Sequence, residues 1–224
     1  MLLRKEYIKT LSVFLIFIFY NIVFNYIFEF VGIRNSITKA FISDILVFGI
    51  ILVIYRSVMK NNLIQYKKNY DFKSSIKIII KTLLIMVICN IAISFLSYFV
   101  LGDEINELNA IQSLVNQSIP YLIFKSLFFS SIVETLVFQY SIKQIINNKF
   151  IYIIISSLIF MLMNLIYLDF NSRYLVFDLL SYFIMSLIFA LTYIKTDNIY
   201  FIIIIKILYN IIPLIANIIM LGEI

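Results

Sequence analysis

Residues 77–101 of the chain read KIIIKTLLIMVICNIAISFLSYFVL. No charged residue follows Lys81 in this stretch, and a helix rising 1.5 Å per residue over its uncharged part spans the roughly 30 Å hydrocarbon core of a bilayer. A β-barrel strand would instead show a run of about ten residues with alternating hydrophobicity. The stretch therefore predicts a transmembrane helix.

Six further apolar runs follow the same pattern, and they lie at about residues 10–30, 40–55, 120–142, 150–168, 174–194 and 199–220. The run at 40–55 is the shortest. Hydrophobic residues make up 63% of the 224 residues and charged residues 13%, and the mean hydropathy is +1.03. This leaves too little polar surface to cover a water-soluble globule. The predicted fold is all-α, a polytopic transmembrane bundle of about seven helices.

Basic residues divide unequally between the two sides of this bundle. Thirteen of the 18 lysines and arginines fall on the side of the N-terminus, and three fall on the opposite side. The positive-inside rule therefore predicts a multi-pass protein of the plasma membrane with a cytoplasmic N-terminus and an external C-terminus. Residues 103–118 carry apolar residues at helical spacing, which predicts a short amphipathic helix on the external surface.

The composition also excludes several classes of function. The chain has no histidine, so the commonest metal ligand and the commonest general base are absent, and we expect neither a metal nor another cofactor. The single cysteine, Cys89, lies in an apolar run and indicates no disulfide framework. The net charge of +6 is explained by topology, so we expect no nucleic-acid partner.

Polar residues inside the apolar runs are the candidate functional residues, because a charge at a helix centre costs about 2.5–3.5 kcal/mol even on the lenient insertion scale. Glu134 lies near the middle of the run at 120–142, and Lys206 lies in the last run. Neither is expected to reach water easily, so both are predicted to face the bundle interior. Asn164 and Asn210, taken singly, favour interhelical hydrogen bonds over chemistry. Lys125 is expected to snorkel outward.

Three short motifs in the second half of the chain resemble those of the CPBP family, which comprises CAAX-processing endopeptidases and bacteriocin-processing or immunity proteins, also called the Abi family. Residues 134–139, ETLVFQ, resemble its EExxxR motif. Residues 160–164, FMLMN, resemble FxxxH, and residues 206–210, KILYN, resemble HxxxN. The likeness covers roughly residues 120–215. Since the apolar runs leave no room for a soluble domain, we expect a single membrane domain over residues 1–224, with N-terminal helices and the external segment in residues 1–118 and a CPBP-like core in 119–224.

The family's motif positions fall on Glu134, Asn164, Lys206 and Asn210. The resemblance implies that Glu134 is a base and Asn210 an oxyanion donor. Asn164 replaces a histidine and cannot take a proton near neutral pH, while Lys206 replaces the second histidine and could neutralise Glu134. The second Glu and the Arg of the first motif are also replaced, by Thr135 and Gln139. These departures favour a non-catalytic member.

The same mapping predicts that Glu134 and Lys206 face each other, with their charged groups within about 4 Å or bridged by one water. Glu134 precedes Lys143 by about nine residues, and Lys206 follows Ile199 by about seven, so both lie roughly 10–14 Å from the cytoplasmic ends of their helices. Their depths in the membrane therefore match.

Three functions remain open from the sequence. The first is a membrane interaction protein that binds a peptide or another membrane protein in the bilayer, with bacteriocin immunity or scaffolding as family-like roles. The second is an intramembrane endopeptidase of altered chemistry, with Glu134 as base and Lys206 and Asn210 as electrophilic donors. The third is a small transporter subunit, although the sequence lacks paired helices broken by Gly or Pro.

Overall fold

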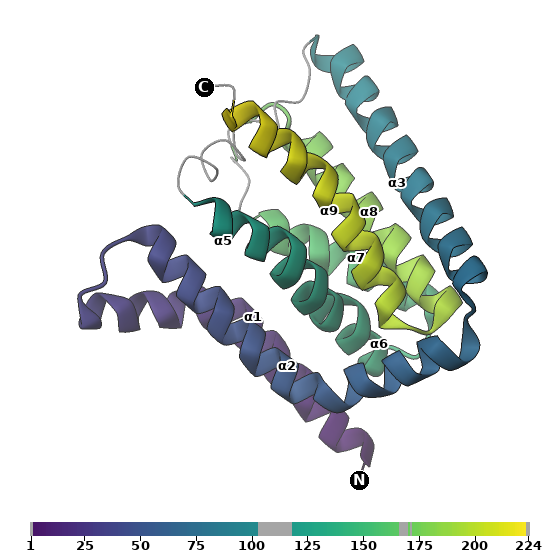
Figure 1. Cartoon of the computed structure of the whole chain (residues 1–224), viewed down its shortest axis with the longest axis horizontal. Helices are drawn as coiled ribbons and strands as arrows, with labels where there is room; N and C mark the ends of the chain where they lie inside the picture. The colour runs from purple at the N-terminus through teal and green to yellow at the C-terminus, as the bar shows by residue number, and fades with distance from the viewer. Residues whose placement is uncertain (1, 103–117, 166–169, 171, 223–224) are drawn as a thin grey trace.

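The computed structural model describes residues 2–102, 118–165, 170 and 172–222. Its elements are α1 (Leu2–Val31), α2 (Ser36–Asn69), α3 (Phe72–Leu101), α5 (Ile119–Ile123), the π-helix η1 (Phe124–Ser141), α6 (Ile142–Ile145), α7 (Lys149–Leu165), α8 (Leu175–Thr196) and α9 (Ile199–Gly222). Because α5, η1 and α6 follow one another without a break, the described residues form seven helical rods (Figure 1). The all-α prediction is confirmed.

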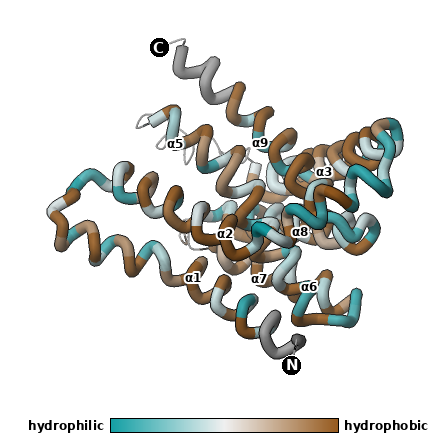
Figure 2. The backbone as a smooth tube through the Cα atoms, turned by 60° about the horizontal axis from the view of Figure 1, so that its bottom comes forward, coloured by the Kyte–Doolittle hydropathy of each residue, from teal (hydrophilic) through white to brown (hydrophobic). Residues whose placement is uncertain are grey.

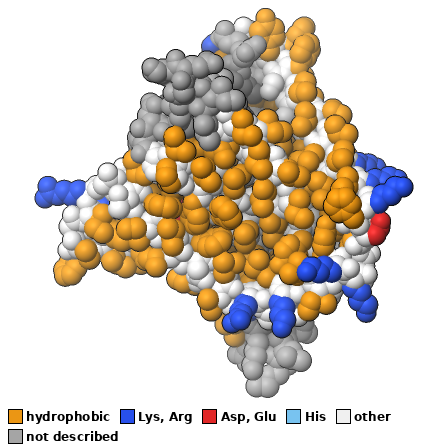
Figure 3. All heavy atoms as spheres, viewed as in Figure 1, with side chains coloured by type: hydrophobic (Ala, Val, Ile, Leu, Met, Phe, Trp, Pro, Cys, Tyr) orange, Lys and Arg blue, Asp and Glu red, His pale blue; other side chains and the backbone are white. Residues whose placement is uncertain are grey.

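Length and hydropathy of these rods match a multi-pass membrane protein. In the described part of the chain, α1, α2, α3, the α5–η1–α6 rod and α8 are long and apolar enough to cross a bilayer, and α7 and α9 contain shorter apolar segments. Figure 2 shows the hydrophobic residues along the helices and the hydrophilic ones mainly near their ends. Figure 3 shows the same division on the surface, with hydrophobic side chains over the middle and Lys and Arg at the edges. The predicted external helix at 103–118 falls almost wholly outside the described residues.

The second helix is much longer than the apolar run at 40–55. It begins at Ser36, where Asn35 caps it by accepting from the backbone N–H groups of Ile37 and Thr38, and it extends to Asn69. The prediction stopped at the basic residues beyond position 55 because it followed hydropathy alone. A helix satisfies its own backbone hydrogen bonds and can continue past the apolar layer. Figure 1 shows α2 leaving α1 and changing direction before it meets α3.

The polar end of α2 packs against the turn between α8 and α9. Asn62 accepts a hydrogen bond from the backbone N–H of Ile199 at 3.1 Å, and its backbone carbonyl accepts from the Asn198 amide at 2.7 Å. The Tyr70 hydroxyl donates to the carbonyl oxygen of Thr196 at 3.0 Å. These contacts attach the segment with predicted cytoplasmic charges to the helix that carries Lys206.

The same end of the bundle also holds the start of α1 and the turn between α6 and α7. The Tyr7 hydroxyl donates to the carbonyl oxygen of Ile145 at 3.3 Å, and Lys143, Lys149 and Asp197 line one cavity there. The basic connections that the sequence assigns to one side therefore lie together. Whether this side faces the cytoplasm remains a prediction.

The π-helix η1 lies at the centre of the bundle, where it contacts α1, α2, α7, α8 and α9. Its fully buried side chains include Val133, Leu136 and Val137. Side-chain hydrogen bonds five residues apart, such as Ser141 Oγ to the Leu136 carbonyl oxygen at 2.7 Å, accompany its wider turn. π-Helices are rare and mostly limited to a single turn, and they occur frequently at functional sites.

Candidate functional site

The candidate site is a polar ladder between η1 and α9. The side-chain amide of Asn210 donates to the backbone carbonyl oxygen of Ser126 at 2.8 Å. One turn away on α9, Lys206 Nζ donates to Glu134 Oε2 at 2.9 Å and to the Ser130 carbonyl oxygen at 3.5 Å. Ser126 and Ser130, four residues apart on η1, thus meet Asn210 and Lys206, four residues apart on α9. The neighbouring helix supplies donors to two backbone carbonyl groups of η1, those of Ser126 and Ser130.

The Glu134–Lys206 pair confirms the predicted pairing. The side chain of Lys206 is 5% exposed and that of Glu134 is 18% exposed, so the ammonium is withdrawn from solvent more fully than the carboxylate. Removing such a charge from water costs several kcal/mol, which a close partner offsets only when the remaining hydrogen-bonding groups are also satisfied. The Ser130 carbonyl oxygen supplies one further acceptor.

Two aromatic rings complete the surroundings of the Lys206 ammonium. Its Nζ lies 4.9 Å from the ring centroid of Phe160 and 5.1 Å from that of Phe189. Cations are attracted to ring faces at such distances by the ring quadrupole. Phe160 is the first residue of the second motif and is buried, so the three motif helices converge on this ammonium.

Asn164, by contrast, bonds within its own helix. Its side-chain amide donates to the carbonyl oxygen of Phe160 at 2.8 Å, one turn back along α7. Among the described residues, the contacts of Asn164 do not include Glu134 or Lys206. The structure therefore brings Glu134 and Lys206 together, sets Asn210 one turn away on α9, and leaves Asn164 engaged with its own backbone.

The two other replaced motif positions lie in the core. Thr135 is fully buried and donates to the Ser131 carbonyl oxygen at 2.7 Å, within η1. Gln139 accepts from the Tyr152 hydroxyl at 2.9 Å, and its amide donates to Ser186 Oγ at 3.4 Å. A neutral amide between α7 and α8 is satisfied by these neutral partners, whereas an arginine at this position would need a counter-charge.

A second buried ion pair escaped the sequence analysis. Asp44 on α2 is 1% exposed and accepts hydrogen bonds from Lys125 Nζ at 2.8 Å, from the Tyr20 hydroxyl at 2.8 Å and from the Tyr121 hydroxyl at 3.0 Å. The prediction that Lys125 snorkels outward is therefore wrong. The lysine turns inward because Asp44 offers it a charge partner, and its Nζ also lies 4.7 Å from the ring centroid of Phe129.

The chemistry open to the ladder follows from its contacts. A general base needs a free lone pair near water, and the Lys206 ammonium occupies Oε2, one of the two carboxylate oxygens of Glu134. An oxyanion donor needs a free N–H, and one of the two N–H groups of the Asn210 amide donates to a backbone carbonyl, which leaves at most one. No group of three potential metal-ligating His, Cys, Asp or Glu residues occurs in the part of the chain that the structure describes.

Comparison with known proteins relates the second half of the chain to a described family. Residues 116–212 match the family described as type II CAAX prenyl endopeptidase Rce1-like. No curated protein and no solved structure matches the chain. The matched segment includes all of the polar ladder and both of its helices up to the end of the third motif. The chain is thus a multi-pass membrane protein, and its residues 116–212 are similar to the Rce1-like family of type II CAAX prenyl endopeptidases.

Proposed function

We propose that this protein is a catalytically inactive relative of the CAAX endopeptidases that works by binding a peptide or another membrane protein within the bilayer. The observation that carries the proposal is the ion pair between Lys206 and Glu134 at 2.9 Å. Bacteriocin immunity and scaffolding of an envelope protein are the roles within this class. The proposal places the protein in the plasma membrane, with its N-terminus in the cytoplasm.

Charge compensation at the ladder supports inactivity. The Lys206 ammonium bonds to Glu134 Oε2 at 2.9 Å and so occupies one oxygen of the carboxylate that would have to activate water. No histidine is present in the chain to share that work. The amide of Asn164, which occupies the second motif's histidine position, cannot serve as a base at neutral pH.

A cleavage assay tests the proposal. Purified protein is incubated with a prenylated CAAX peptide and, separately, with an unmodified membrane-embedded peptide. We expect no cleavage of either peptide by the wild type, as followed by mass spectrometry. A photoreactive version of the peptides should crosslink to η1 or α9 if binding persists without hydrolysis. The crosslink should be competed by the unlabelled peptide.

Glu134→Gln is the decisive variant, and Glu29→Gln is its matched control because Glu29 is largely exposed at a helix end. Cleavage by the wild type and by Glu29→Gln that is lost in Glu134→Gln would refute the proposal and support the endopeptidase of altered chemistry. Failure of both peptides to crosslink would refute the peptide-binding part.

A further inference from the structure

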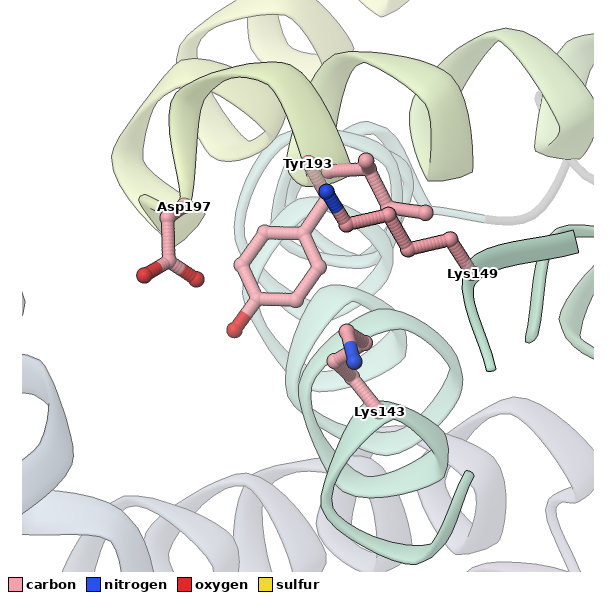
Figure 4. Close-up of a pocket in the computed structure, with 5 residues that line it drawn as sticks. Lys143, Lys149, Tyr193 and Asp197 are labelled. Atoms are coloured by element: carbon pink, nitrogen blue, oxygen red, sulfur yellow. The ribbon is translucent and has the colours of Figure 1, made fainter. Parts of the chain in front are cut away.

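A charged cavity lies at the end of the bundle that holds the basic connections, away from the polar ladder. It has a volume of about 240 Å³ and is lined by Lys143, Lys149, Tyr193, Ile194 and Asp197 (Figure 4). These residues come from the end of α6, the start of α7 and the end of α8. The cavity thus combines two ammonium groups, a phenol and a carboxylate.

Two polar groups of this cavity make no hydrogen bond in the described part of the chain. Tyr193 is only 4% exposed, and among the described residues its hydroxyl has no hydrogen-bond partner. Figure 4 shows this hydroxyl directed toward the side of the cavity where Asp197 lies. Lys149 is exposed and its ammonium likewise has no partner in the described part of the chain. The Tyr193 hydroxyl is not among the fully buried atoms that lack a partner, so it is accessible from the cavity that it lines and can donate a hydrogen bond to a ligand there, as can the Lys149 ammonium.

Lys143 and Asp197 are held in place by the backbone. The ammonium of Lys143 donates to the Ile146 carbonyl oxygen at 3.3 Å and lies 5.7 Å from the ring centroid of Tyr152. Asp197 ends α8 in a left-handed conformation with φ of 47°, and its N–H bonds to the Tyr193 carbonyl oxygen at 2.7 Å. A basic and an acidic group are therefore presented from two different helix ends.

The position of the cavity indicates a lipid. Helix ends of a transmembrane bundle lie at headgroup depth. Large hydrophobic side chains within two turns of the cavity are exposed, including Ile145, Phe150, Ile151 and Leu191. In a bilayer these side chains contact acyl chains. Basic pockets between helices on the cytoplasmic side bind phosphorylated headgroups.

We infer that this cavity binds the headgroup of a phosphatidylethanolamine, with the phosphate at Lys143, Lys149 and the Tyr193 hydroxyl and the primary ammonium at Asp197. The carboxylate is the reason for choosing a zwitterionic headgroup. A purely anionic headgroup would leave Asp197 facing negative charge, which is unfavourable. The quaternary ammonium of a choline headgroup has no N–H to donate to the carboxylate.

Native mass spectrometry of the full chain, purified in detergent and stripped of lipid, tests the inference. The probes are phosphatidylethanolamine, phosphatidylglycerol and phosphatidylcholine with identical acyl chains, together with soluble glycerophosphoethanolamine to separate the headgroup from the whole lipid. We expect phosphatidylethanolamine to be retained most tightly. Lys149→Gln should weaken this retention about tenfold, as expected for loss of one charge-assisted hydrogen bond.

Asp197→Asn should abolish the preference for phosphatidylethanolamine over phosphatidylglycerol while leaving phosphatidylglycerol bound. Lys195→Gln is the matched control, since it lies on the same helix end, is exposed and does not line the cavity. Equal retention of the three lipids by the wild type would overturn the inference, as would equal effects of Lys149→Gln and Lys195→Gln. Binding of glycerophosphoethanolamine alone, without the lipid, would show a soluble ligand and overturn the assignment to a lipid.

Discussion

At the scale of single residues, the bundle satisfies its charges in pairs. Glu134 with Lys206 and Asp44 with Lys125 each join two helices at N–O distances of 2.9 Å and 2.8 Å. The side chains of Lys206 and Asp44 are buried. An unpaired charge at such a depth would have to lose its charge or draw water into the bundle. The pairs therefore determine which way η1 faces its neighbours, whatever their net contribution to stability.

Removing one partner of the Glu134–Lys206 pair should cost more than removing both. Lys206→Met leaves a carboxylate without its partner and should lower stability by about 3 kcal/mol, near the lower end for broken buried pairs because Glu134 keeps some solvent contact. The corresponding drop in Tm is about 6–12 °C for a chain of this size. Glu134→Gln combined with Lys206→Met should recover more than half of that loss.

Thermal unfolding in one detergent measures this difference, and Lys77→Met on the exposed surface of α3 controls for removal of any lysine. A double variant that is less stable than Lys206→Met alone would contradict the pairing argument. So would a loss for Lys206→Met no greater than that for Lys77→Met.

At the scale of elements, α9 begins on a cap supplied by another helix. Asn198 accepts from the backbone N–H of Tyr200 at 3.0 Å in the usual local manner. The backbone N–H of Ile199, the residue before Tyr200, donates instead to the side chain of Asn62 on α2. The start of the helix that carries the ladder thus depends on a residue far away in sequence.

Asn62→Ala should therefore loosen the first turn of α9. The variant leaves a buried backbone N–H without an acceptor and should cost about 1 kcal/mol, typical of a lost cap. Amide hydrogen exchange at residues 199–202 should become faster. Asn61→Ala, next to it on the exposed side of α2, should change neither exchange nor Tm. Protection at 199–202 that is the same in both variants would show that the cap has no such role.

At the scale of the whole molecule, the basic connections lie together at one end of the bundle. This unequal distribution of Lys and Arg predicts the orientation in the membrane. A cysteine at position 68, in a Cys89→Ser background, should be labelled by a membrane-impermeant maleimide only after the cells are opened. A cysteine at position 34, exposed at the opposite end, should be labelled on intact cells. The reverse pattern would place the N-terminus outside.

The sequence alone determined the class of the protein, the number of helices and the pairing of Glu134 with Lys206. These depend on local quantities, namely the length of apolar runs and the spacing of three motifs that a known family shares. Hydropathy could not determine the full length of α2, because helical hydrogen bonding continues where apolar character stops. It could not reveal the π-helix either, because apolar runs look alike in both helix types.

Only the tertiary structure decided where the other polar groups go. Asp44 and Lys125 lie in separate apolar runs without a motif, and their pairing depends on how α2 and η1 rotate about their own axes. Asn164 kept the motif position but turned to its own backbone. Rotation and rotamer are set by the packing of neighbouring helices, which is a property of the whole bundle and leaves no local trace in the sequence.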